Sequence, residues 1–83
     1  MKVTVIGSHL CPDTLYALNR LAGAGAEVEF KDILSCHAAL QDYLQIRESS
    51  PLYAEIRGTR RLGVPCFERE DGTLNLDLND ILG

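Results

Sequence analysis

The sequence lacks the features that mark several large classes of protein. Basic residues are few, because 8 Lys and Arg stand against 12 Asp and Glu and give a formal net charge of -4. A protein that binds nucleic acid through the phosphate backbone needs a basic surface instead. No apolar run approaches the roughly 20 residues that cross a bilayer, and the first residues lack the long apolar core of a signal peptide. We therefore expect no nucleic-acid partner, no membrane insertion and a cytoplasmic location.

Cysteine is also scarce, and its number is odd. The three residues are Cys11, Cys36 and Cys66, and no pair of them has the short Cys-x-x-Cys spacing of a structural zinc site. Without a secretion signal, free thiols are expected rather than a disulfide framework. Burial as a small apolar side chain is common for free cysteine and is the favoured interpretation of Cys36. Metal binding is therefore a weak hypothesis, and at least one thiol remains a candidate for reactivity.

The composition fits one compact domain over residues 1–83, because 46% of the residues are hydrophobic and 24% are charged. The pattern predicts a strand that ends at Gly7, a helix over about residues 12–23 and a second strand that reaches Ile33. This order of elements predicts a right-handed crossover between two parallel strands.

The second half of the chain predicts a broken helical region followed by a hairpin. Ser35 is the expected cap of a helix, and a short helical piece is expected to start at Ser50-Pro51. The helix is expected to turn three apolar side chains inward, Leu40, Tyr43 and Leu44. Asp71-Gly72 lies between two strand-like runs, which is a strong hairpin signal, and residues 77–82 predict a short closing helix.

The order βαβαββα resembles that of the glutaredoxins, with Cys11-Pro12-Asp13-Thr14 at the first strand-to-helix junction and Gly63-Val64-Pro65-Cys66-Phe67 before the hairpin. The resemblance spans nearly the whole chain and is closest to a small subgroup with a Cys-Pro-Asp-Cys motif. It implies an α/β, thioredoxin-like fold with a four-stranded mixed sheet flanked by helices. It also implies a reactive Cys11, glutathione as co-substrate and no bound cofactor. By the same resemblance, the bond before Pro65 is cis and the backbone of Val64 pairs with the bound peptide or glutathione.

The chain departs from that subgroup at Thr14, where a dithiol member has its second cysteine. The expected mechanism is therefore monothiol, with the Cys11 thiolate attacking a mixed disulfide that a second thiol, usually glutathione, then resolves. The helix N-terminus favours the thiolate, and the Thr14 hydroxyl is a candidate donor to the sulfur, with a plain helix-surface threonine as the alternative. Asp13 would repel the thiolate, and His9 is a secondary candidate to offset that repulsion.

The glutathione contacts that the resemblance implies are only partly present. Arg60 and Arg61 precede the Val-Pro pair as basic residues do in glutaredoxins, and they are candidates to pair with a glycine carboxylate. Solvated surface charge is their alternative interpretation. Asp77 lies near the position from which family members bind the glutathione amino group. Ser8-His9 replaces the lysine of the family, and no Gly-Gly turn follows the hairpin.

The topology predicts that all three cysteines lie at one end of the sheet. Cys66 is then a candidate resolving thiol for Cys11, because neighbouring strands lie roughly 4.8 Å apart and a disulfide needs Cα atoms within about 7 Å. We expect a monomeric thiol-disulfide oxidoreductase whose partner is glutathione, or a glutathionylated or disulfide-bearing protein. A non-enzymatic redox-sensing or binding module and an inert domain remain open as alternatives.

Overall fold

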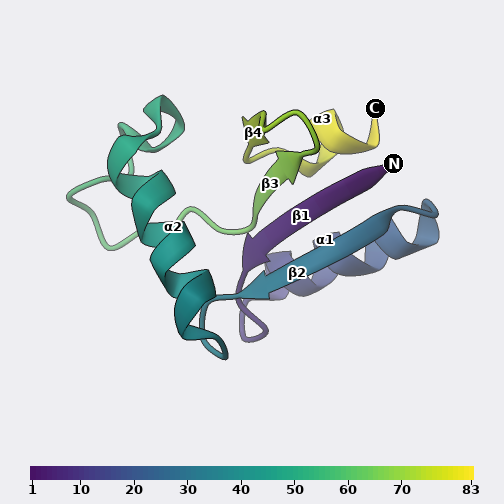
Figure 1. Ribbon diagram of the computed structural model, residues 1–83, viewed down its shortest axis with the longest axis horizontal. Coiled ribbons are helices and arrows are strands. Elements are labelled where there is room, and N and C mark those ends of the chain that lie inside the picture. Colours follow the sequence, from purple (N-terminus) through teal and green to yellow (C-terminus); the bar gives the residue numbers. More distant parts are fainter.

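The computed structural model describes residues 1–83 as a four-stranded mixed sheet with three α-helices (Figure 1). In chain order the elements are β1 (Lys2–Gly7), α1 (Pro12–Gly23), β2 (Glu27–Asp32), α2 (His37–Ser49), the 3₁₀ turn η1 (Pro51–Tyr53), β3 (Cys66–Arg69), β4 (Leu74–Asn75) and α3 (Leu78–Leu82). The strands lie side by side in the order β2-β1-β3-β4. β1 is parallel to β2 and antiparallel to β3, and β3 is antiparallel to β4. The expected order of elements and the parallel crossover are confirmed.

The first helix begins and ends where the sequence predicts. Pro12 occupies the first helical position, where its missing N–H has no partner to lose. After Gly23 the chain turns through Gly25, whose φ of 75° lies in the left-handed region that glycine adopts without a steric penalty.

The second helix differs from the prediction in its cap and in its buried face. Cys36, not Ser35, precedes α2, because the Ser35 hydroxyl donates instead to the Asp32 carboxylate at 2.7 Å. The buried residues of α2 are Ala39 and Tyr43, which lie one turn apart. Leu40 is partly buried beside them, whereas Leu44 is 45% exposed. The expectation that Leu44 points inward is therefore wrong.

The hairpin and the closing helix lie where the sequence predicts. Gly72 has a φ of 87°, and the carboxylate of Asp71 accepts hydrogen bonds from both the backbone N–H and the hydroxyl of Thr73. These bonds lower the pKa of Asp71. Asp77 caps α3, because its Oδ1 accepts the N–H of Asn79 at 2.9 Å.

The sheet separates two hydrophobic clusters, because side chains alternate between its faces along each strand. On one face, α1 and α3 cover the α1 cluster, which consists of Val3, Val5, Ala17, Leu21, Phe67 and Ile81. On the other face, α2 and η1 pack against the α2 cluster, which consists of Ile6, Ile33, Tyr43, Tyr53, Ile56 and Cys66. Figure 1 shows α1 behind the sheet and α2 beyond the ends of β1 and β2.

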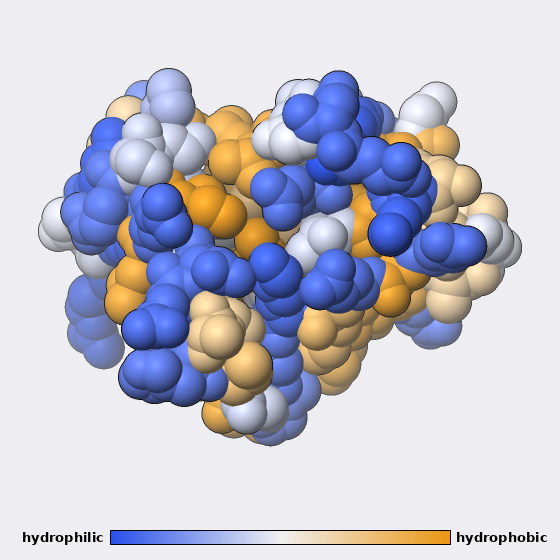
Figure 2. All heavy atoms as spheres, viewed as in Figure 1, coloured by the Kyte–Doolittle hydropathy of each residue, from blue (hydrophilic) through white to orange (hydrophobic).

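The surface is largely hydrophilic on the face drawn in Figure 2, and hydrophobic side chains show in the hollow between α2 and the hairpin. In Figure 1, α2 leaves much of that face of the sheet uncovered. No helix combines the length and the apolar character needed to span a membrane.

Candidate functional site

Cys11 lies in a short, well-braced loop between β1 and α1. Its N–H donates to the carbonyl of Ser8 at 3.0 Å, and its own carbonyl accepts the N–H of Leu15, which starts the helix. The Ser8 hydroxyl accepts the N–H of Leu10 at 3.0 Å, so this nearly buried serine folds the loop back on itself. The Cys11 side chain makes no capping hydrogen bond, and its thiol is free and partly exposed. A reactive atom at this end of a twelve-residue helix faces the positive pole of the helix dipole.

Thr14 does not have the role that the sequence predicts. It is fully buried, and its Oγ1 accepts the N–H of Ser8 at 3.3 Å. No hydrogen bond joins it to Cys11. A Cβ at Gly7 would lie 2.6 Å from Thr14 Oγ1, so the glycine makes room for this contact. Thr14 therefore braces the loop that presents Cys11 and is neither a thiolate partner nor a helix-surface residue.

The three cysteines follow or begin strands at the same end of the sheet, as the topology predicts, but they differ in exposure. Ile6 near the end of β1 pairs with Cys66 at the start of β3, and Gly7 pairs with Asp32 at the end of β2. Cys36 is exposed, so its expected burial is wrong.

Cys66 is only 1% exposed and packs within the α2 cluster, where burial raises the pKa of its thiol. Its neighbour Phe67 belongs to the α1 cluster on the opposite face. Cys11 is the N-cap residue of α1, which covers that opposite face. Cys66 therefore faces away from the side of the sheet that α1 covers, and its burial disfavours it as the resolving thiol.

A polar network that the sequence does not reveal joins the loop before Cys11 to the turn before Cys36. His9 Nδ1 lies 2.7 Å from Asp32 Oδ2, and the Ser35 hydroxyl donates to the same oxygen at 2.7 Å. Partial desolvation of Asp32 opposes its ionisation, but hydrogen bonds from Ser35, from the Leu34 N–H and from His9 together lower its pKa to about 2. His9 therefore faces a carboxylate, with its side chain 48% exposed. In the sequence, His9 follows the first predicted strand and Asp32 lies near the end of the second, which is predicted to reach Ile33, so only the parallel pairing of these strands suggests that the two residues meet.

Pro65 borders a groove beside α1. The bond between Val64 and Pro65 is cis, as the resemblance implies, and both residues are half-buried just before β3. The Pro65 groove has a volume of about 300 Å³ and is lined by Asp13, Tyr16, Ala17, Pro65, Phe67, Leu76, Leu78 and Asn79. Its lining begins in the first turn of α1, two residues after Cys11. A groove lined mostly by apolar residues can hold a short extended segment.

Of the three side chains predicted to contact glutathione, only Asp77 lies next to residues that line this groove. Asp77 is exposed between two groove residues, Leu76 and Leu78, although one of its oxygens caps α3. Arg60 and Arg61 are exposed in the segment before β3, and neither lines the groove. The charged residue in the lining is Asp13, so the groove offers no cation to a carboxylate.

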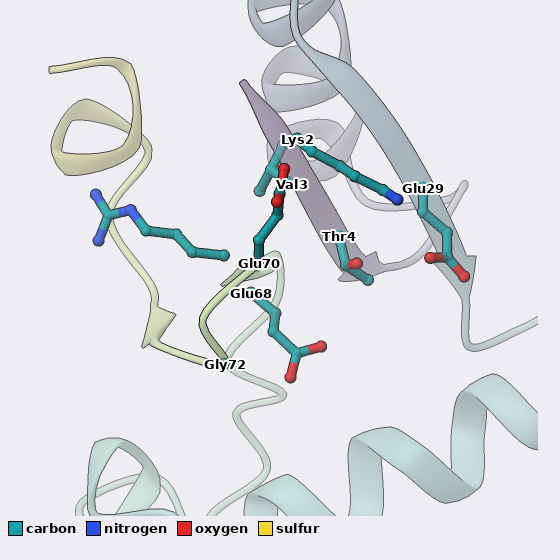
Figure 3. Close-up of a pocket in the computed structure, with 8 residues that line it drawn as sticks. Lys2, Val3, Thr4, Glu29, Glu68, Glu70 and Gly72 are labelled. Atoms are coloured by element: carbon teal, nitrogen blue, oxygen red, sulfur yellow. The ribbon is translucent and has the colours of Figure 1, made fainter.

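A separate hollow of about 440 Å³ lies at the other end of the strands. Figure 3 shows Lys2 extending toward β2, from which Glu29 projects, with Thr4 and Glu68 on the neighbouring strands. It contains neither cysteine nor histidine. No group of three or more His, Cys, Asp or Glu side chains in the chain is placed to hold a metal ion. The chemistry-bearing residues therefore concentrate at the Cys11 end.

Comparison of this chain with known protein families, with curated proteins and with solved structures gives no match.

Proposed function

We propose that this chain is a glutaredoxin-like thiol-disulfide oxidoreductase with a thioredoxin-like fold and a monothiol mechanism. The fold assignment is supported by the strand order β2-β1-β3-β4, by the parallel β1–β2 pair and by helices on both faces of the sheet. The observation that carries the activity is a free, partly exposed thiol at Cys11, at the N-terminus of α1 and two residues before Asp13, where the lining of the Pro65 groove starts.

The proposed reaction has two exchange steps. The Cys11 thiolate attacks the glutathione sulfur of a mixed disulfide, so that a disulfide between Cys11 and glutathione forms and the substrate leaves as a thiolate, which takes a proton from water. A second glutathione thiolate then attacks the glutathione sulfur bound to Cys11. Oxidised glutathione leaves and the Cys11 thiolate is restored, so the net reaction converts one mixed disulfide and one free glutathione thiol into the substrate thiol and oxidised glutathione.

A monothiol route is supported by the lack of a second thiol within the Cys11-Pro12-Asp13-Thr14 motif. Thr14 fills the position of the second motif cysteine, and Cys66 is buried in the α2 cluster. In the proposed complex, the backbone of Val64 pairs with the extended substrate and Pro65 borders it. Asp77 is the candidate partner of the glutathione amino group, and Arg60 and Arg61 are the candidates for the glycine carboxylate. Of these three side chains, Asp77 lies closest in sequence to the groove residues.

The experiment is reduction of a glutathionylated peptide by glutathione with the protein in catalytic amounts. We expect turnover by the wild type, loss of at least about a hundredfold in Cys11→Ser, and wild-type rates in the matched control Cys36→Ser, because only the nucleophile is essential. Equal rates for Cys11→Ser and the wild type would overturn the assignment of Cys11. No turnover by the wild type would overturn the enzymatic function.

A redox-sensing module is the second candidate, and one observation favours it. Asp13 is the charged residue that lines the Pro65 groove, so the groove supplies no cation to recruit the glutathione that would resolve the intermediate. A sensor would form a stable mixed disulfide at Cys11 without turnover. Mass spectrometry after incubation with oxidised glutathione, followed by the turnover assay, separates the two functions.

A further inference from the structure

The segment that leads to Val64 has no regular secondary structure of its own. Residues 60–65 form the last part of the connection from η1 to β3, and none of their backbone groups takes part in a backbone–backbone hydrogen bond. In Figure 1 this stretch returns from the far end of α2 to the sheet. Residues 60–62 are exposed and residues 63–65 are half-buried, so hydrogen bonds from side chains can hold this stretch in place.

Arg47, near the end of α2, donates to two carbonyls of this stretch and to two carbonyls of the turns before it. Its Nη1 donates to the carbonyl oxygen of Arg61 at 2.6 Å and lies 3.5 Å from that of Leu62. Its Nη2 donates to the carbonyls of Ile56 at 3.2 Å and Thr59 at 3.1 Å. Neither ion pair of the structure includes Arg47, so its half-buried guanidinium is directed at backbone oxygens and at the hydroxyl of Tyr43.

Two tyrosines of the α2 cluster extend this support to the residue before Val64. The Tyr43 hydroxyl donates to the carbonyl of Leu62, and the Tyr53 hydroxyl donates to that of Gly63 at 2.6 Å. Gly63 has a φ of 70°, and a Cβ there would lie 2.6 Å from the Tyr53 ring. The chain is thus held at successive points up to Val64.

We infer that Arg47 is a positioning residue for the substrate groove: it holds residues 56–62 so that the backbone of Val64 is presented to the bound substrate. The inference rests on the proposed function, because it assigns Arg47 a role in that same site. Arg47 does not line the groove and would touch no substrate. Its planar fork of five N–H donors matches carbonyls that approach from several directions, which the three donors of a lysine ammonium cannot reproduce.

Arg57 provides a matched control within the same region. Its Nη1 donates to the carbonyls of Arg47 at 2.8 Å and Ser50 at 2.9 Å. These bonds join the end of α2 to the turn after it, and they hold no carbonyl of residues 60–65. Loss of Arg57 therefore removes arginine–carbonyl bonds from the fold without releasing the segment before Val64.

The experiment measures KM and kcat for the glutathionylated peptide with full-length Arg47→Met, Arg47→Lys and Arg57→Met. We expect Arg47→Met to raise KM about tenfold with kcat within about twofold, because a loosened Val64 weakens binding of the substrate and of the transition state alike. Arg47→Lys should recover part of the loss, and Arg57→Met should leave KM within about twofold of the wild type. Tyr53→Phe, which frees the carbonyl of Gly63, should raise KM even if Arg47→Met does not fold.

The outcomes separate the inference from the function on which it rests. Wild-type turnover combined with an unchanged KM in Arg47→Met, or with an equal rise in Arg57→Met, overturns the positioning role alone. An unchanged KM in both Arg47→Lys and Tyr53→Phe overturns it as well. A wild type without turnover overturns the proposed function, and the inference with it.

Discussion

The two faces of the sheet are built from the same strands but differ in which side chains they expose and which they bury. On the α1 face, Ala17 and Phe67 belong to the hydrophobic cluster and also line the Pro65 groove, whose lining starts two residues after the partly exposed Cys11. On the α2 face, the thiol of Cys66 is buried, and the polar groups of the tyrosines point toward backbone carbonyls of the segment before β3. Adjacent residues of β3 thus face different surroundings: Phe67 lines the groove of the α1 face, and Cys66 packs with the tyrosines that hold the segment before β3.

Thiol labelling gives the largest expected contrast between the faces. Cys66 should react with iodoacetamide about a thousandfold more slowly than Cys11 in the native protein, because its thiol becomes accessible only in opened states. Burial also raises the pKa of Cys66, which leaves less thiolate at neutral pH. Peptide mass spectrometry over time measures the rates, with concentrated urea as the control in which the difference should collapse. Similar native rates would mean that the α2 face is open.

The sequence was sufficient for the parts of the fold that depend on local signals. Pro12 and the glycines after residue 22 define α1, and Asp71-Gly72 defines the hairpin. The convergence of the three cysteines at one end of the sheet also followed, because it depends only on strand directions. These features need no knowledge of which face a side chain occupies.

The sequence was not sufficient to place residues whose surroundings depend on the face of a strand or on the packing of a loop. The side chains of β3 alternate between the two faces of the sheet, so a register shift of one residue would turn Cys66 from the α2 cluster toward α1. Thr14 is three residues after Cys11, but the close approach of Gly7 draws its hydroxyl to the β1 loop. The contacts of Arg47 with carbonyls up to 15 residues away leave no periodic signal in the sequence.

A second prediction tests how tightly the α2 face holds its segment. Gly63→Ala should destabilise the protein by about 3 kcal/mol, because the left-handed backbone and the contacts of a new Cβ with Tyr53 and Ile56 both oppose it. Gly72→Ala is the control, with a φ of 87° and open space around it, and should cost only about 1 kcal/mol. Urea unfolding measures both losses. Equal losses in the free energy of unfolding would show that the segment before Val64 can move to accommodate the new Cβ.

The smallest expected effect concerns the link between the two faces, because Asp32 joins the loop before α1 to the turn before α2. Its pKa is lowered to about 2 from an ordinary value of 3.8, so its ionised form stabilises the fold above the ordinary value and this contribution is lost as the pH falls through about 2. We expect Asp32→Asn to melt below the wild type near about pH 6, and the difference to close between about pH 4 and about pH 2. Asp80→Asn is the control, because it removes an exposed carboxylate whose Oδ2 accepts a 3.4 Å hydrogen bond from the Asn75 side-chain amide, and it should lower the melting temperature less. If the difference in melting temperature between Asp32→Asn and the wild type persists unchanged at the lowest pH, the ionised form of Asp32 is not what stabilises the contact between the two loops.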